Sequence, residues 1–480
     1  MAEPAMIHPA VALSRPVEAD VAAGRRRQHG RRLPDSRAPL SGDTMPAIPL
    51  VTRGNGLRLH CADGSEYLDA VSGTFNLPLG YNHPHVVAAV QQQASLMSHV
   101  SSDLARPYAQ SLLDRLLALA PPQMGAGWIR DATGSTAVEC AVKIAQKATG
   151  KSDVITLFHG HHGQTALTTS MSGPAWRREG FPLQNSGGIL RVPEPNCASC
   201  FYGQTYPSCE LLCARRISDI AAQAGRGSTA CLIVEPVLGN GGNIVPPKGY
   251  FRALRRVCDD LGILLIADEV QTGVGRTGYF LASERFDIRP DIIVLAKGLG
   301  GVGVPIGAVL MRSELDVLQA SDHSFTGGGN LLGLAAAQAT LDVVGARDFL
   351  AGVRLRGAYL GGLLSSLSQR QPRVGQVRGV GMMWGVEIVD AAGRPDPETA
   401  RAVVGIARDR HHLITRSSEY GRGHILKVRP ALIATESDLE EIVDRLGASV
   451  CDASVREAES VREVESVRDV EGTQHASAGL

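Results

Sequence analysis

The sequence lacks an excess of charge of either sign. Its 480 residues carry 48 lysines and arginines against 48 aspartates and glutamates, so the formal net charge is zero. Binding to nucleic acid phosphates favours a basic field, which this overall balance does not provide. The arginine-rich run at residues 25–32 is better interpreted as a solvated tail than as a nucleic-acid-binding arm. We therefore expect no nucleic acid among the partners.

Long hydrophobic runs are also missing. Although 44% of the residues are hydrophobic, no unbroken apolar run reaches the roughly 18 residues of a membrane-spanning helix. The N-terminus lacks the apolar segment of a secretory signal. Nine cysteines, an odd number scattered over a long chain, fit a reducing compartment better than a disulfide framework. These features predict a cytoplasmic protein without membrane contact.

Two apolar, β-branched runs, 264–267 and 292–295, predict buried parallel strands. Asp268 follows the first run directly, and Lys297 follows the second run after one alanine. Because ligands of open α/β sheets bind beyond the carboxyl ends of strands, both side chains are expected in one crevice. A lysine there can hold pyridoxal 5'-phosphate (PLP) as a Schiff base, and a carboxylate can keep the pyridine nitrogen protonated. A capped turn and a solvated lysine are the alternative interpretation.

Three further strand ends carry polar residues. The run WIRDATGSTAVECAVKIAQKA predicts a strand, a turn and an amphipathic helix, whose first N–H groups suit a phosphate or an ordinary N-cap. In FHGHHGQT, we favour one of His159, His161 and His162 stacking on a flat cofactor ring over a metal site. Glu235 ends another strand and either faces the same crevice or forms a structural ion pair.

The segment CASCFYGQTYPSCELLC has the spacing C-x2-C-x8-C-x3-C. Four thiolates so arranged can bind zinc, and the candidate ligands are Cys197, Cys200, Cys209 and Cys213. Free thiols are the alternative, because the middle spacing is short and unpaired thiols are common in cytosolic enzymes. In sequence this insertion lies away from the other candidate residues.

Together the motifs resemble the class III (ornithine/4-aminobutyrate-type) aminotransferases of PLP fold type I, over about Thr52 to Leu446. The resemblance rests on DEVQTGVGRTG followed by Ala296-Lys297-Gly298, and YLDAVSG, GSTAVECAVKIA, FHGHHGQT, VEPVLGNGG, FTGGGN and VRGVGMMWGVE agree with it. It implies an α/β fold: a large domain with a seven-stranded, mostly parallel sheet, and a smaller α+β domain built from both chain ends.

The expected domain organisation follows from this resemblance and from composition. The large PLP-binding domain spans 101–345, with a Cys-rich insertion at 195–215, and the small domain combines 46–100 with 346–449. Residues 1–45, rich in Ala, Pro and Arg, predict a disordered extension. Residues 450–480 include three tandem hexamers, SVREAE, SVREVE and SVRDVE, and predict a low-complexity, partly helical tail.

The resemblance also implies roles for matching residues in a homodimer with active sites at the interface. Lys297 would be the Schiff-base lysine, and Asp268 would contact the pyridine nitrogen. The other expected cofactor contacts are Gly134 and Ser135 from one subunit and Thr326 from the other at the phosphate, and His161, Val270 and Gln271 at the ring. The expected substrate contacts are Phe75, Glu235, Lys427 and Arg429.

One departure concerns substrate recognition. Many family members have an arginine three residues before Pro-Pro that binds the substrate carboxylate, but here that position holds Lys427, with Arg429 displaced by two residues. Lysine cannot form the bidentate fork that arginine offers to a carboxylate. The hypothesis is that one half-reaction uses an atypical amine or carbonyl partner of specialised metabolism.

The predicted function is therefore ping-pong transfer of an amino group from an amino donor to a carbonyl acceptor. Three alternatives share the cofactor: an amino-acid racemase or epimerase, a decarboxylating aminotransferase, and a phospho-amine lyase, since fold does not settle reaction type. A non-catalytic protein that binds zinc or a partner on a retired scaffold is the alternative outside enzymes.

Overall fold

A computed structural model describes residues 49–101, 103–181, 188–418 and 423–455. The predicted N-terminal extension, with its arginine cluster, and residues 456–480 of the predicted tail lie outside this part of the chain. Within the described ranges, no helix combines the length and the apolarity needed to cross a membrane.

The large part of the molecule is built on a seven-stranded sheet with the strand order β4-β10-β9-β8-β7-β5-β6. All neighbouring pairs are parallel except those of β10, which runs antiparallel to β4 and β9. The predicted seven-stranded, mostly parallel sheet is confirmed. The strands are β4 (Ala126–Asp131), β5 (Asp153–Leu157), β6 (Ile189–Val192), β7 (Thr229–Val234), β8 (Leu264–Asp268), β9 (Ile292–Leu295) and β10 (Gly307–Met311).

Helices cover both faces of this sheet, which explains why its central strands are apolar along their whole length. One face packs on α5 (Gly134–Thr149), and the other packs on α10 (Leu331–Val344) and on α7 (Leu212–Ala224) with α8 (Tyr250–Leu261). The remaining short elements of the large part are α4 (Ala109–Ala118), α6 (Ala166–Met171), η1 (Ala175–Arg177), η3 (Cys197–Ser199), α9 (Ala282–Arg285), η4 (Lys297–Gly300) and η5 (Ser313–Leu315).

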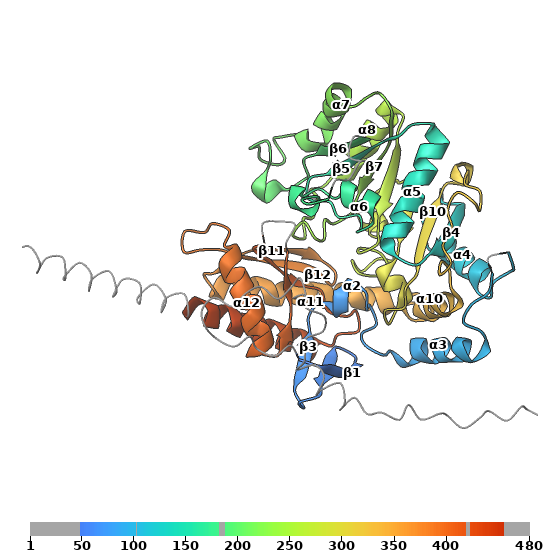
Figure 1. Ribbon diagram of the computed structural model, residues 1–480. Coiled ribbons are helices and arrows are strands. Elements are labelled where there is room, and N and C mark those ends of the chain that lie inside the picture. Colours follow the sequence, from blue (N-terminus) through green and yellow to red (C-terminus); the bar gives the residue numbers. More distant parts are fainter. Residues whose placement is uncertain (1–48, 102, 182–187, 419–422, 456–480) are drawn as a thin grey trace, which may run out of the picture.

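A smaller part lies below the large sheet in Figure 1 and joins the two ends of the described chain. The N-terminal strands β1, β2 and β3 continue into C-terminal β13, which pairs in parallel with β3. A second sheet has the order β11-β12-β15-β14. Leu57 and Leu68 share one hydrophobic core with residues of α11 and α12. The expected α+β part built from both ends is therefore confirmed.

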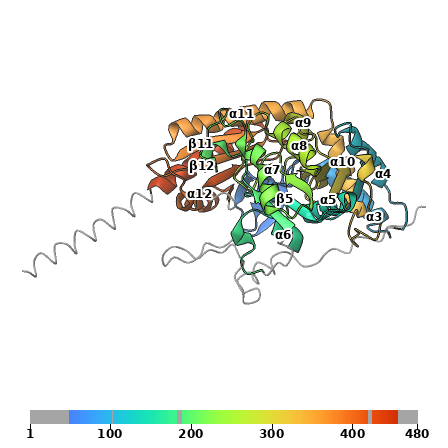
Figure 2. The same ribbon diagram turned by 90° about the horizontal axis from the view of Figure 1, so that it is seen from above.

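The smaller part includes a hairpin and a long last helix. Asp63 and Gly64 lie in the turn that joins β2 to β3, and the last helix spans 436–455 of the described chain. Figure 2 shows α12 at one end of the molecule and α3 and α4 at the other. The elements are β1 (Val51–Asn55), β2 (Arg58–Cys61), β3 (Glu66–Asp69), α2 (Ser72–Phe75), α3 (Pro84–Leu96), α11 (Phe349–Arg370), β11 (Val374–Val380), β12 (Met383–Ile388), α12 (Pro397–Asp409), β13 (Leu413–Ile414), β14 (Arg416–Ser417) and β15 (Ile425–Val428).

Candidate active site

The carboxyl ends of six strands meet at one edge of the large sheet, since all of its strands except β10 run in the same direction. Asp268 is the last residue of β8, and Lys297 follows β9 after one alanine. Glu235 follows β7 directly, and the histidine turn follows β5. The topology therefore brings four of the predicted strand-end positions to one place.

Asp268 is buried and held by hydrogen bonds to both of its carboxylate oxygens. Its Oδ2 lies 2.7 Å from His162 Nδ1, and its Oδ1 accepts a hydrogen bond of 3.1 Å from the Val270 backbone N–H. The other ring nitrogen of His162, Nε2, is buried and has no hydrogen-bond partner in the described part of the chain. The Asp268 carboxylate thus has a fixed orientation and keeps capacity to accept another donor.

Lys297 begins the η4 turn with a backbone φ of 43°, in the left-handed region that a residue with a side chain seldom adopts. Burial lowers the pKa of its ammonium, while the negative charges of Asp268 and Glu235 partly oppose that shift. Lowering this pKa favours the neutral amine, which is the form that can attack a carbonyl or accept a proton.

Glu235 is buried and clamps two loops at this edge. Its Oε1 accepts from the His161 backbone N–H at 2.9 Å, and its Oε2 accepts from the Gly239 N–H at 3.0 Å. Burial raises the pKa of Glu235, and the nearby Asp268 carboxylate adds to that rise. For His161, burial and then the charge of Lys297 lower the pKa to about 2, so its ring is neutral near pH 7.

The start of α5 lies against the loop that follows β8. Thr133 caps the helix by accepting a hydrogen bond of 3.2 Å from the Thr136 N–H, a contact worth about 1 kcal/mol in such positions. A Cβ added to Gly134 would lie 2.8 Å from Val270 Cγ1, so only glycine fits this close approach. Ser135 Oγ accepts from the Gln164 N–H at 3.0 Å. Thr326 is exposed and stands in the glycine turn before α10.

Two cations flank the ring of Phe75. Lys427 Nζ lies 5.2 Å from the ring centroid and donates to Asn240 Oδ1 at 3.0 Å. The guanidinium carbon of Arg429 lies 4.5 Å from the same centroid. These positions give the site a positively charged wall next to an aromatic ring.

Arg429 is fully buried and its guanidinium is engaged by protein acceptors. It donates to Gln271 Oε1 at 2.6 Å and to the Gly239 carbonyl at 2.7 Å, and it also bonds to Asn243 Oδ1. Burial lowers its pKa to about 9, with the charge of Arg276 adding to the effect. The same Gln271 was expected beside the cofactor ring, so these contacts link that position to β15.

Sequence reasoning missed two contributors at this edge. His162 was seen only as one histidine of three, because its partner Asp268 is 106 residues away. Glu269 was not singled out; it is buried and accepts from Thr272 Oγ1 at 2.6 Å and from the Ala282 and Ser283 N–H groups at 3.0 and 2.6 Å. Its position after Asp268 in DEVQ was the available signal, since a second acid beside a buried strand must find donors.

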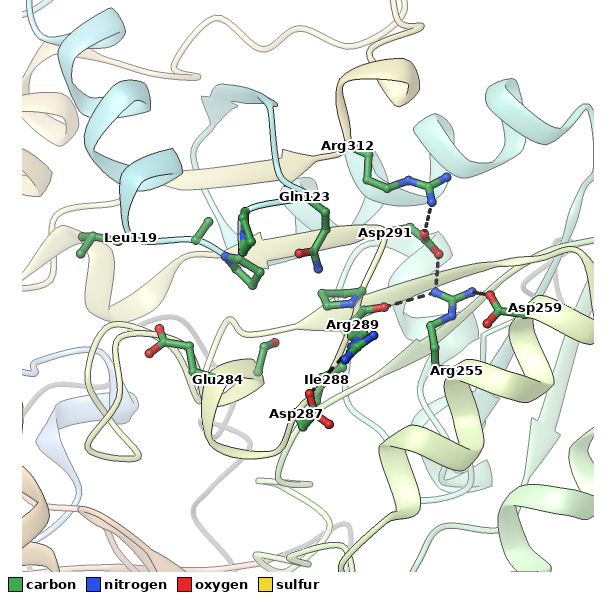
Figure 3. Close-up of a pocket in the computed structure, with 15 residues that line it drawn as sticks. Leu119, Gln123, Arg255, Asp259, Glu284, Asp287, Ile288, Arg289, Asp291 and Arg312 are labelled. Carbon is green, nitrogen blue, oxygen red and sulfur yellow. Dashed lines mark hydrogen bonds and ion pairs between the residues drawn. The ribbon is translucent and has the colours of Figure 1, made fainter.

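A separate cavity of about 750 Å³ lies at the opposite edge of the sheet. Figure 3 shows Asp291, which precedes β9, with Arg255 and Arg312 directed at its carboxylate. The lining mixes positive and negative side chains around Pro121, Pro122 and Pro290. None of the predicted cofactor or substrate residues lines it.

The family model for class III aminotransferases matches residues 41–450. The chain belongs to the class III aminotransferases. It is 37% identical over 402 residues to an acetylornithine aminotransferase of Methanopyrus kandleri, covering 82% of this chain and 94% of that one. It is 29% identical over 432 residues to an alanine/serine racemase of Pyrococcus horikoshii, covering 87% and 89%.

Solved structures resemble this class III aminotransferase along most of its length. An amine transaminase from an uncultivated Pseudomonas species, in its PLP-bound form, superposes with a TM-score of 0.79 at 31% identity, covering 88% of this chain and 99% of that one. Enzymes of this family use PLP, and the residues here fit it: a buried lysine whose pKa is lowered, a buried carboxylate with spare acceptor capacity, and the close approach at Gly134.

Proposed function

We propose that this enzyme is a cytoplasmic, homodimeric, ping-pong aminotransferase that uses a small amino donor and a small carbonyl acceptor. The observation that carries the proposal is the placement of Asp268 and Lys297 at the carboxyl ends of adjacent parallel strands, with His162 2.7 Å from the Asp268 carboxylate. An acid and an amine in this arrangement match the two polar ends of the PLP ring system.

Each residue then has a definite task. PLP, when bound, supplies a ring that takes up the electron pair left on a deprotonated substrate carbon. Lys297 Nζ would hold the cofactor, and its amine would carry a proton at the substrate carbon as base and then acid. Asp268 would keep a proton on the pyridine nitrogen, and His162 fixes the orientation of that carboxylate.

The remaining cofactor contacts position the ring and phosphate. Gly134 and Ser135 would hold the phosphate through the first N–H groups of α5. Val270 and His161 would flank the ring, with Gln271 near its oxygen substituent. We propose that Thr326, which is exposed in the single chain, completes the phosphate contacts of the other subunit.

We also propose that Lys427 meets an anionic group of the substrate as a point charge. The guanidinium of Arg429 is already engaged by Gln271, Gly239 and Asn243, so we assign it a positioning role. The charges of Lys297 and Lys427 both contribute to the lowered pKa of His161, which supports their placement in one site. Phe75 would pack on the substrate beside Lys427.

Variants of Lys427 test this assignment. Lys427→Met should raise KM for anionic amino donors about tenfold, the effect of losing about 1.4 kcal/mol of charge interaction, with little change for uncharged amines. Lys427→Arg should shift preference toward α-carboxylates, which suit a bidentate fork. Steady-state kinetics on a donor panel measures both effects, and unchanged donor preference in the two variants would contradict the role.

The racemase relative favours one second candidate function, racemisation on the same scaffold. Incubation of the PLP-loaded enzyme with a single enantiopure donor and no acceptor separates the two reactions. Aminotransfer converts one equivalent of cofactor to pyridoxamine phosphate and stops. Racemisation inverts the donor repeatedly without accumulating pyridoxamine phosphate. A decarboxylating or lyase reaction would instead release carbon dioxide or phosphate from the donor.

A further inference from the structure

Four cysteines of the insertion line one small cavity. Cys197 begins η3, Cys200 follows it, Cys209 lies in the next turn, and Cys213 stands in the first turn of α7. All four border a cavity of about 20 Å³, which is close to the space taken by one water molecule or ion. No lysine or arginine is among its lining residues, and one acid, Glu194, is.

A divalent cation would give these gathered sulfurs a common partner. Bound among them, it would stabilise all the thiolates together.

We propose that Cys197, Cys200, Cys209 and Cys213 form a structural Zn²⁺ site. One Zn²⁺ replaces four thiol protons, which are released to solvent, and forms four Zn–S bonds without any change of oxidation state. A tetrahedral site with Zn–S bonds of about 2.3 Å requires sulfurs roughly 3.8 Å apart. Among the described residues no three of these sulfurs lie within 4.8 Å of one another, so ligation draws the loop closer.

The consequence reaches the sheet edge that holds the candidate active site. Phe201, between Cys200 and Cys209, packs edge-on against Phe158 with ring centroids 5.4 Å apart. Phe158 follows β5 and directly precedes the histidine turn. Glu194, on the cavity wall, lies 2.7 Å from His159 Nδ1. A zinc-bound loop therefore braces the turn that carries His161, a role independent of the proposed reaction.

A second group of possible metal ligands, outside the insertion, serves as a comparison. The ligand atoms of Asp131, Cys140 and His323 do lie within 4.8 Å of one another, and all three residues are buried. However, His323 Nε2 is 2.9 Å from Asp131 Oδ1, so one ligand atom of each of these two groups is already engaged by the other. We assign the metal to the insertion, where the four ligands have the chemistry that zinc prefers.

The test is the metal content of the full-length, PLP-loaded enzyme after growth with zinc. The wild type, Cys140→Ala and the exposed-cysteine control Cys451→Ser should each contain about one zinc per chain by plasma mass spectrometry. The double variant Cys200→Ser/Cys209→Ser should contain at least about tenfold less.

Titrating the wild-type enzyme with an organomercurial avoids dependence on whether the double variant folds. Zinc release should follow the modification of four thiols and should be accompanied by increased protease cleavage within 195–215. The proposal is overturned if the wild type holds no zinc and takes up none after reduction, if zinc is lost with Cys140→Ala but kept in the double variant, or if the four thiols are found as disulfides.

Discussion

The two edges of the large sheet each hold a buried carboxylate, and the two differ in what neutralises it. At the carboxyl edge, Asp268 Oδ2 lies 2.7 Å from the imidazole Nδ1 of His162. At the other edge, Asp291 lies 2.8 Å from Arg255 and 3.1 Å from Arg312, and also accepts from the Leu265 N–H at 2.7 Å. Guanidinium groups keep their charge at every physiological pH.

This difference separates a structural carboxylate from one suited to chemistry. Both oxygens of Asp291 are bound by permanent cations, as Figure 3 shows, and the cluster fastens α8 to the starts of β8 and β9. Asp268 has one imidazole and one backbone N–H, which leaves lone pairs for a further donor. Burial alone does not distinguish the two residues; the partners do.

The largest expected effect comes from removing the amine at the carboxyl edge. Lys297→Ala should lose the absorbance of covalently bound PLP and lower kcat by about 10³-fold or more, because both the covalent attachment and the proton carrier disappear. Absorbance spectroscopy and single-turnover kinetics measure these losses. The exposed Lys248→Ala is the control and should match the wild type. A variant that kept both properties would show that the amine lies elsewhere.

Replacing each of the two carboxylates by an amide tests the comparison between the edges most directly. Asp268→Asn should lower kcat by about 10²-fold, as expected for one lost electrostatic contact to a reacting group, with a small change in unfolding free energy. Asp291→Asn should do the reverse: kcat within about twofold, and an unfolding free energy about 2 kcal/mol lower, because the partly exposed Arg255 and Arg312 each lose one charged hydrogen-bond partner.

Activity assays and denaturant titrations of both variants give the four values needed. If Asp291→Asn lost activity as strongly as Asp268→Asn while remaining folded, the assignment of the second edge as purely structural would fail.

Sequence patterns predicted the parts of the fold that depend on local order. The apolar runs before Asp268 and Lys297 defined β8 and β9, because strands covered on both faces are uniformly apolar. In the same way, the position of Glu235 at the end of another strand places it at the carboxyl edge of the sheet. The turn between β2 and β3 contains Asp63-Gly64, a local pair typical of hairpins.

Contacts between distant segments could not be read in this way. Nothing local to His162 indicates that its ring meets Asp268, since the pairing depends on the order of strands in the sheet. Likewise, Arg429 follows β15 in a smaller sheet, and its hydrogen bond to Gln271 arises only when the two parts pack together. Distance in sequence also concealed that Phe201 of the cysteine insertion reaches Phe158.

The smallest predicted effect concerns His161, which should make stability depend on pH at the carboxyl edge of the sheet. Its folded-state pKa of about 2 lies below the unfolded value near 6.5, so the unfolded chain binds a proton that the folded chain does not. Stability conferred by the neutral ring is therefore present above pH 6.5 and falls as the pH decreases. His161→Phe removes this linkage and keeps a ring able to stack.

Denaturant titrations of the cofactor-free protein at pH 7 and pH 5 measure the difference. Between these pH values the wild type should lose up to about 2 kcal/mol more unfolding free energy than His161→Phe. This is the largest loss that protonation of one histidine allows over the roughly 1.5 pH units below an unfolded-state pKa near 6.5. The sheet edge at Asp291 should add no pH dependence to the unfolding free energy between pH 7 and pH 5, because guanidinium groups keep their charge over this range. An identical loss in both proteins would mean that the His161 ring is solvated enough to protonate in the folded state.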